Sequence, residues 1–192
     1  MEQRMDHAEL IQRILSGESR AFGELVELYQ HMVYTVCMRV LRNPEDAQEA
    51  SQDAFVKAYR NLSGFSGSSK FSTWLYTIAY RSAISRARQR RTDTDHLDDL
   101  THQPSAAGTG EALHKRDVRQ YLNQALEKLT PEESTILSLH YLDEQSVEEI
   151  VTITGLSASN VKVRLFRSRK RLEAVLNKEL NGEARSLLLN DA

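Results

Sequence analysis

Apolar residues recur at steps of three and four along most of the chain, which is the spacing of an amphipathic helix and not of a strand. A short helix is expected from Asp6 to Ser16, with Gly17 as its stop, and Ser19 is the expected cap of a longer one. The apolar stripe of that longer helix contains Phe22, Leu25, Val26, Tyr29, Met32, Val33, Val36 and Val40. The pattern predicts an all-α protein.

The sequence Asn43-Pro44-Glu45-Asp46 predicts the start of a third helix. It supplies a capping side chain, a proline in the first turn and acids at the positive end of the helix. This helix should end near Leu62 and be followed by a Gly/Ser loop at residues 63–70. Phe71 then opens a fourth helix, whose apolar face gives way to a run of arginines.

The composition changes between residues 92 and 112, where five acids, no Lys or Arg, one proline and two glycines replace the helical pattern. We interpret this stretch as a flexible linker between two helical domains at residues 1–91 and 113–180. A tail at residues 181–192 should fray. In the second domain, Thr130 and Glu133 predict a capping box that starts a helix at Pro131.

The next segment has the layout of a helix-turn-helix. Ser146 and Glu149 predict a capping box for a short apolar helix, and Gly155 is its expected left-handed stop. Ser157 or Ser159 then caps a longer basic helix. This order of a short helix, a tight turn and a longer helix is typical of proteins that place the second helix in the DNA major groove.

The basic helix has an unusual outer face. Residues 162–171 contain six basic and no acidic side chains. The helical wheel places Val161, Leu165, Ser168 and Leu172 on the inner stripe and Lys162, Val163, Phe166, Arg167 and Lys170 on the outer face. Cations can reach phosphates and guanine edges, and apolar groups can contact thymine methyls, so this face suits DNA. A helix for a calmodulin-like groove or an anionic surface is the alternative.

The net charge of −2 hides a strong segregation of charge. Residues 81–91 contain five arginines and no acid, so the two basic runs hold 11 of the 25 Lys and Arg within 21 residues. The other 171 residues carry 14 bases and all 27 acids, a net charge of −13. Two concentrated basic surfaces indicate two contacts with nucleic acid, whose affinity falls with salt.

The remaining composition narrows the class of protein. A single cysteine, Cys37, excludes an intramolecular disulfide and a Cys-rich zinc site and fits a buried position. The six histidines lack metal-ligand spacing, and no phosphate loop or carboxylate constellation indicates an enzyme. Without a long apolar run or a signal-peptide core, we expect a soluble cytoplasmic protein that needs no cofactor and does not insert into a membrane.

Three ordered motifs carry a resemblance to a known family: NPEDAQEASQDAFVKAY at residues 43–59, KFSTWLYTIAYR at 70–81 and SASNVKVRLFRSRKRL at 157–172. They resemble the extracytoplasmic-function (group 4) sigma factors of bacterial RNA polymerase, within the sigma-70 family. The resemblance implies a region 2-like domain and a region 4-like domain, which bind core polymerase and promoter DNA. It also implies sequestration by an anti-sigma factor.

The resemblance implies a polymerase-binding face on the third helix. In the family, this helix docks on the clamp helices of the largest polymerase subunit, and the second domain binds the flap. The matching residues here are Asp46, Glu49, Gln52, Asp53 and Phe55. Acids at helical spacing suit a basic partner, and an ordinary solvated acidic face is the alternative.

The loop from Phe65 to Ser72 and the helix from Trp74 to Arg91 correspond to the part that opens and reads the −10 promoter element. The candidates there are Phe65, Phe71, Trp74, Arg81 and Arg88. Aromatic rings and nearby cations can hold unpaired bases, although Phe71 and Trp74 could equally be core. Of these rings, Trp74 is expected in the core, and Phe65 on the loop is the better candidate for a base contact. Many members have an asparagine at the position of Arg81, so the family's base preference does not transfer.

The outer face of the basic helix corresponds to the family's reader of the −35 element. Lys162, Val163, Phe166 and Arg167 match its contact positions, and the helical wheel adds Lys170. Members often have a hydroxyl residue where this chain has Val163, so the −35 sequence does not transfer either. The alternative function is a stand-alone helix-turn-helix regulator, which leaves the Gly/Ser loop and residues 81–91 without a role.

Overall fold

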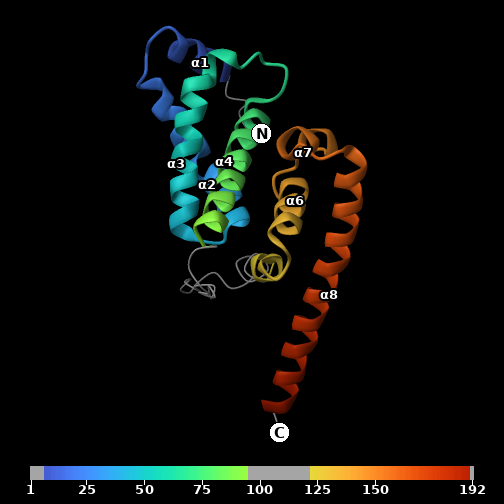
Figure 1. The fold of residues 1–192 in the computed structure, drawn as a ribbon. Coiled ribbons are helices and arrows are strands. Elements are labelled where there is room, and N and C mark those ends of the chain that lie inside the picture. The colour runs from blue at the N-terminus through green and yellow to red at the C-terminus, as the bar shows by residue number, and fades with distance from the viewer. Residues whose placement is uncertain (1–6, 95–121, 191–192) are drawn as a thin grey trace. The chain divides into compact units, whose positions relative to one another are not determined.

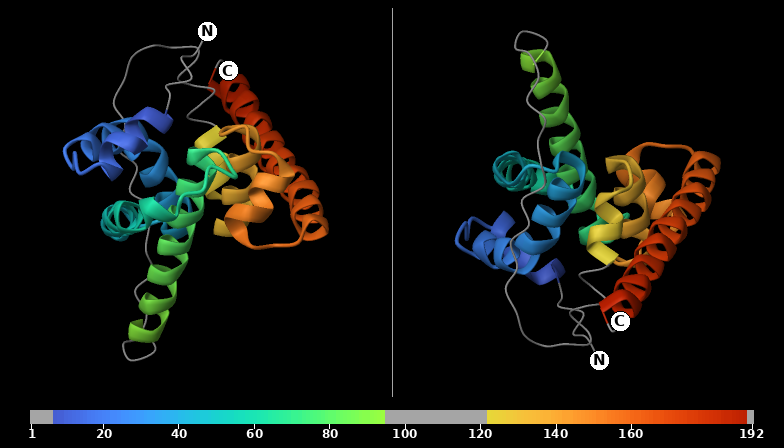
Figure 2. Two further views of the ribbon diagram at one scale, coloured as in Figure 1. Left: turned by 90° about the horizontal axis from the view of Figure 1, so that it is seen from above. Right: turned by 90° about the horizontal axis from the view of Figure 1, so that it is seen from below.

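The computed structural model describes the backbone of residues 7–94 and 122–190, and the side chains of residues 8–90 and 122–178. These residues form helices and loops without a strand, and the chain divides into two compact units (Figure 1; Figure 2). The first unit contains α1 to α4. The second contains a short helical stretch at residues 122–127 together with α6 and α8. The predicted all-α fold is confirmed.

The first unit is a bundle of three long helices and one short helix. They are α1 (His7–Leu15), α2 (Ala21–Leu41), α3 (Pro44–Asn61) and α4 (Phe71–Thr94), with a 3-10 turn at Leu62–Gly64. α2, α3 and α4 all pack against one another, and α1 packs on α2. The buried face of α3 consists largely of alanines, which allow its neighbours to approach closely: Ala47, Ala50, Ala54 and Ala58.

The helix boundaries of the first unit follow local signals, with one exception. The side chain of Asn43 caps α3 by accepting a hydrogen bond from the Asp46 amide at 2.8 Å, as predicted. The predicted cap at Ser19 is wrong. Because Arg20 already has helical dihedral angles, the Ser19 carbonyl and not its hydroxyl accepts the bond from the Phe22 amide, at 3.1 Å.

The longest run of buried residues in the described part of the second unit lies in α6 (Pro131–Tyr141). The predicted capping box is present, because the Thr130 amide donates to the Glu133 carboxylate at 3.1 Å and the Glu133 amide donates to the Thr130 hydroxyl at 3.4 Å. α6 packs against α8 (Ala158–Asn190). Six consecutive residues of α6, 134–139, are buried in the described structure.

The helix-turn-helix is formed by α7 (Val147–Thr154) and the start of α8. The predicted box between Ser146 and Glu149 is present, with bonds of 2.8 and 3.2 Å. Gly155 ends α7 with a φ of +74°, a left-handed angle that favours glycine. The Asn160 amide donates to the Ser157 hydroxyl at 3.3 Å, so Ser157 is the residue that caps α8.

The ends of α4 and α8 extend beyond the predicted domain limits. α4 continues to Thr94, past the expected end of the first domain at residue 91, and α8 continues through the expected tail to Asn190. Ala, Leu, Glu and Arg are strong helix formers and prevail over Gly182 in that tail. Residues 95–121, which hold most of the predicted linker and the predicted start of the second domain, lie outside the described residues.

Candidate nucleic-acid interface

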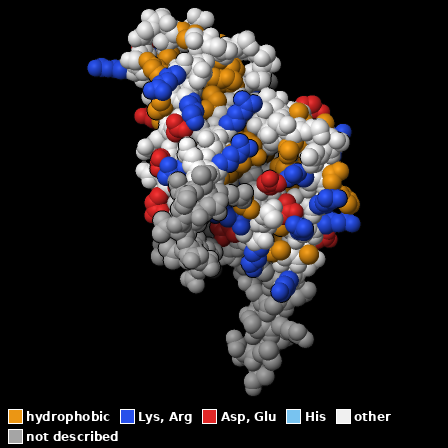
Figure 3. Space-filling model, viewed as in Figure 1, with side chains coloured by type: hydrophobic (Ala, Val, Ile, Leu, Met, Phe, Trp, Pro, Cys, Tyr) orange, Lys and Arg blue, Asp and Glu red, His pale blue; other side chains and the backbone are white. Residues whose placement is uncertain are grey.

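The outer face of α8 combines cations with exposed apolar side chains. Lys162, Arg167 and Lys170 are exposed, and Val163 and Phe166 lie among them with 45% and 50% of their surface accessible. The Lys170 ammonium lies 4.7 Å from the centre of the Phe166 ring, within reach of a cation–π contact. Figure 3 shows basic and apolar side chains next to one another along this helix. All five predicted −35 residues therefore share one accessible face.

The inner face of α8 holds the helix to its own unit. Val161, Leu165 and Ser168 are buried, as the helical wheel predicts. Beside them, Arg164 pairs with Glu132 at the start of α6, and the Arg164 Nε donates to the Asn160 side chain at 2.9 Å. These contacts fix which side of α8 can face a ligand.

A second arginine of α8 pairs with the start of α6. Arg171 donates to the Glu133 carboxylate at 2.6 Å. Partial burial raises the pKa of Glu133, but hydrogen bonds from Thr130 and Arg171 outweigh it, so the net effect is a lowered pKa. Two of the six basic residues at 162–171 thus face an acid of their own unit.

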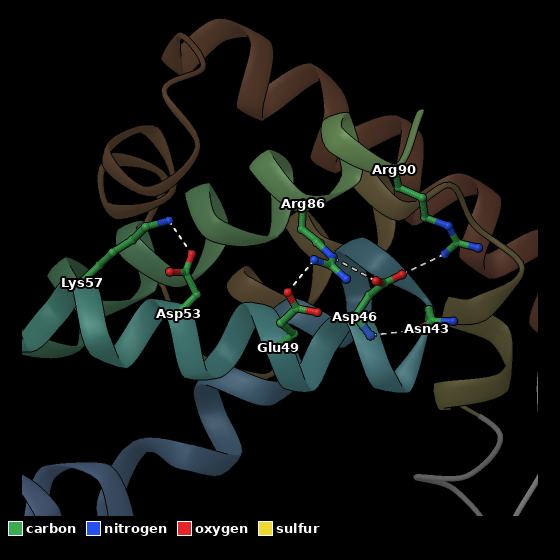
Figure 4. A network of polar contacts seen from close by, with 7 residues as sticks. All are labelled: Asn43, Asp46, Glu49, Asp53, Lys57, Arg86 and Arg90. Atoms are coloured by element: carbon green, nitrogen blue, oxygen red, sulfur yellow. Dashed lines mark hydrogen bonds and ion pairs between the residues drawn. The ribbon is translucent and has the colours of Figure 1, made fainter. Parts of the chain in front are cut away.

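The arginine run of α4 is divided in the same way. Arg81 and Arg88 are exposed and lie on one face, as predicted from their spacing. Arg86 and Arg90 instead turn toward α3, where both pair with Asp46 at 3.0 Å, and Arg86 also reaches Glu49 at 2.6 Å (Figure 4). Charge counting alone does not separate these two pairs of arginines.

An aromatic cluster lies where the Gly/Ser loop meets α4. The rings of Phe65, Phe71 and Trp74 have centroid separations of 5.3 to 5.5 Å, and Tyr29 from α2 lies 5.5 Å from Phe71. Phe71 is buried, with 5% of its surface accessible, whereas Phe65 and Trp74 are half-buried. Phe71 therefore forms the buried side of the cluster, and Phe65 and Trp74 provide the partly exposed rings that a base could reach.

The acidic face of α3 is partly engaged within the first unit. The Asp46 side chain is only 14% exposed, while those of Glu49 and Asp53 are 61% and 51% exposed. Asp53 pairs with Lys57 one turn later at 2.6 Å, as Figure 4 also shows. Gln52 is exposed, and the half-buried Phe55 ring lies 6.5 Å from that of Phe22. A partner could reach Glu49, Gln52 and Asp53 directly.

The internal ion pairs of four arginines, Arg86, Arg90, Arg164 and Arg171, and the contact of Tyr29 with the aromatic cluster were not predicted from the sequence. A signal for the arginines exists in the helical wheel. Arg86 and Arg90 continue the buried stripe of Leu75, Ala79 and Ala83 at steps of three and four. A Lys or Arg at a position on the buried stripe of a helix indicates an acidic partner on the helix that packs against it.

Other kinds of site are not found in the described part of the chain. It contains no group of three or more His, Cys, Asp and Glu that could hold a metal ion. None of its helices is long and apolar enough to cross a bilayer. Cys37 is fully buried, as predicted, and burial raises the pKa of its thiol to about 11.

Comparison with known proteins relates both units to one family. Residues 25–92 match sigma-70 region 2, and residues 119–172 match sigma-70 region 4. Over 177 residues the chain is 32% identical to the ECF RNA polymerase sigma factor SigW of Bacillus subtilis, which covers 86% of this chain and 94% of that protein. The chain belongs to the extracytoplasmic-function sigma factors. It directs transcription initiation by RNA polymerase at promoters, and the region 2 match sets aside the stand-alone regulator.

Further relatives agree with this family, and two solved structures share the fold. The chain is 31% identical to the RNA polymerase sigma-H factor of Pseudomonas aeruginosa over 88% of its length and 92% of that protein. The ECF sigma-E factor of Escherichia coli K12 is 31% identical over 90% of this chain and 95% of its own. The fold is similar to the sigma factor RpoE of Bartonella quintana in complex with the anti-sigma factor NepR, with a TM-score of 0.70, 23% identity and coverage of 81% and 96%. CnrH in complex with the cytosolic domain of CnrY gives 0.61, 24% identity and coverage of 88% and 96%.

Proposed function

We propose that this sigma factor divides promoter recognition between the outer face of α8 and a surface formed by α4 and the loop before it. The exposed apolar pair on α8 carries this proposal, because Val163 and Phe166 lie on the only side of the helix that its contacts with α6 leave accessible in the described structure. There they can reach thymine methyls while Lys162, Arg167 and Lys170 reach phosphates and base edges. This face reads the −35 element.

The −10 element is assigned to the aromatic cluster and the exposed arginines of α4. Phe65 and Trp74 offer rings for stacking unpaired bases, and Arg81 and Arg88 offer charge for the strand's phosphates. Phe71 supports those rings without contacting a base. The work of the aromatic cluster is to hold the separated strand, which α8 cannot do because its outer face suits a duplex groove.

The acidic face of α3 is assigned to core polymerase. Glu49, Gln52 and Asp53 project from it, next to the partly engaged Asp46 and the half-buried Phe55. They suit the clamp helices of the largest subunit, and the second domain suits the flap. The protein then needs no catalytic group or cofactor of its own, since the polymerase performs the chemistry. It acts in the cytoplasm, where promoter DNA is.

The domain limits follow from the same assignment. Residues 1–91 form the polymerase-binding and −10 domain, residues 113–180 form the −35 domain, residues 92–112 link them, and residues 181–192 are a tail. The acidic linker lets the two domains reach two promoter elements at once.

An anti-sigma factor is the proposed regulator. Two similar folds are sigma factors solved with such a partner. A protein that covers the acidic face of α3 would compete with core polymerase for the same residues. In that case the Glu49→Lys variant should weaken binding to both partners, whereas Lys162→Ala should weaken neither. Sizing-column competition with purified core polymerase measures both effects.

Run-off transcription tests the function as a whole. Purified core polymerase and this protein are incubated with genomic fragments, and transcripts should start at a small set of promoters that core polymerase alone does not use. Promoter specificity should move with α8, so Phe166→Ala should change the ranking of the promoters. Failure of the protein to associate with core polymerase on a sizing column would overturn the proposal.

A further inference from the structure

The arginine run at residues 81–91 is divided by the fold into two functional sets. In charge alone its members are equivalent, and all would suit a nucleic acid. Arg81 and Arg88 are exposed on one side of α4, whereas Arg86 and Arg90 lie on the side that packs toward α3. α3 and α4 run in opposite directions in the first unit, so the end of α4 meets the start of α3 (Figure 1).

Both inner arginines meet a single carboxylate there. Arg86 Nε lies 3.0 Å from Asp46 Oδ1, and Arg90 Nη1 lies 3.0 Å from Asp46 Oδ2, so each oxygen of Asp46 has its own cation. The Asp46 backbone amide is held by the Asn43 side chain at 2.8 Å. With 14% of its side chain exposed, Asp46 is less accessible than Arg86, Arg90 and Glu49.

Arg86 makes a second contact through a different nitrogen. Its Nη1 donates to Glu49 Oε1 at 2.6 Å, while its Nε serves Asp46 (Figure 4). These two acids are three residues apart, on the same side of α3. Only a planar guanidinium has separate donors in the fixed fork that spans both carboxylates. The hydrogen bond to Asp46 and the nearby acids raise the pKa of Arg86.

We propose that Arg86 and Arg90 are positioning residues for −10 recognition and do not contact DNA. They connect the DNA-reading helix α4 to Asp46 in the first turn of α3 and, through Arg86, to Glu49, one of the acids assigned to polymerase. The face of α4 that holds Arg81 and Arg88 is thereby fixed relative to the docking face. This inference rests on the proposed function, because it assigns a task to residues within that surface.

The test compares lysine and alanine variants at a bridging and an exposed position. Core polymerase is saturated with wild type, R86K, R86A, R88K or R88A, and binding to a single-stranded non-template oligonucleotide is measured against salt. The oligonucleotide carries the −10 element of a promoter found by run-off transcription. A phosphate contact tolerates lysine, so R88K should stay near wild type. R86K should lose about three- to tenfold, because a single ammonium nitrogen lacks the two separate donor nitrogens that meet Asp46 and Glu49 in a fixed geometry.

The salt dependence gives a second readout that a loss of positioning does not change. R88A should lower the slope of log affinity against log salt by about 0.7, the value for one phosphate contact on a single strand. R86A should weaken binding at every salt concentration with an unchanged slope. Thermal unfolding followed by circular dichroism confirms that each variant is folded at the assay temperature.

The Asp46→Asn variant shows whether the Asp46 carboxylate helps or hinders binding of the oligonucleotide. If Arg86 were a DNA ligand held back by Asp46, removing that negative charge would strengthen binding of the oligonucleotide. Positioning requires the opposite, and the double variant D46N/R86A should be no worse than R86A. Full activity of R86K, or a reduced salt slope in R86A, would overturn the inference and leave the proposed function intact. Failure of the wild-type protein to join core polymerase would overturn the proposed function itself.

Discussion

The arginine-bearing helices α4 and α8 differ in what their outer faces offer, although their inner faces are built alike. Each turns two arginines toward the first turn of a neighbouring helix that begins with a cap, a proline and two acids. On α4 the exposed positions of the run are polar, namely Arg81, Ser85, Arg88 and Gln89. On α8, Val163 and Phe166 are exposed among the cations. A face with apolar groups can distinguish bases, whereas a purely polar basic face attracts any phosphate backbone.

The inner faces also differ in how the acids are shared. Asp46 receives both arginines of α4, and Arg86 also pairs with Glu49, so the ion pairs between α3 and α4 centre on the partly buried Asp46. On α6, Glu132 and Glu133 take one arginine each, and Glu133 also closes the capping box. The comparison shows that two helix starts with the same local signals can receive a pair of arginines differently: α3 shares Asp46 between them and adds Glu49, whereas α6 offers a separate acid to each.

The largest expected effect separates base reading from phosphate attraction. Arg167→Ala should cost about 1–3 kcal/mol of promoter binding and relax the preference at one position of the −35 element. Arg88→Ala should weaken binding to all sequences alike. Holoenzyme binding to promoter fragments with single −35 substitutions measures both. If Arg167→Ala weakened binding to all fragments equally, Arg167 would contact phosphates, as Arg88 is expected to do, and would not contribute to recognition of the −35 sequence.

The next effect concerns the two capped helix starts. Asn43→Ala and Thr130→Ala should each cost about 1 kcal/mol of stability, because each leaves an amide in the first turn without its acceptor. Hydrogen exchange of the amides of α3 and α6 assigns the loss to its own unit. Glu132→Ala is the matched control, since its carboxylate is 61% exposed and its pair should contribute about 0.5 kcal/mol or less. A Thr130→Ala variant as stable as this control would show that the Thr130 hydroxyl contributes no more than an exposed ion pair.

The shared role of Glu133 predicts a pH dependence confined to the second unit. Its pKa is lower in the folded than in the unfolded chain, so its stabilising contribution is present above the unfolded pKa of about 4.3 and is lost as the pH falls through the folded value. In Glu133→Gln, unfolding of the second unit should depend less on pH below about 5 than in wild type. If the stability of the second unit fell equally with pH in wild type and in Glu133→Gln, Glu133 would not be the group responsible.

The smallest effect concerns buried serines of the second unit. The Ser168 hydroxyl is buried without a hydrogen-bond partner among the described residues, whereas the Ser138 hydroxyl donates to the Ser134 carbonyl at 2.7 Å. Both gain the same helix propensity on substitution by alanine. Ser168→Ala should therefore be more stable than Ser138→Ala by about 0.5–1.5 kcal/mol, the net value of one hydrogen bond. Equal stability in urea titrations would mean that the Ser168 hydroxyl finds a partner in solution.

Most of the fold follows from the sequence because its signals are local. Capping boxes, a proline in the first turn and left-handed glycines act within four residues, so they place the starts of α3, α6, α7 and α8 correctly. The cap at Ser19 failed since a backbone turn can replace a side-chain cap without any change in composition. The five outer residues of α8 were also found locally, because a helical wheel needs only spacing.

The sequence by itself determined the helices, their exposed and buried faces, the two basic runs and the family. Only the tertiary structure decided that Arg86 and Arg90 meet Asp46, that Arg164 and Arg171 meet the start of α6, and that Phe71 lies beneath Phe65 and Trp74. The two residues of each of these ion pairs are 32 to 44 positions apart in the sequence. Whether they meet depends on which turns of the two packed helices lie opposite each other. Helix periodicity states which side a residue faces, but the packing of a second helix decides what it meets there.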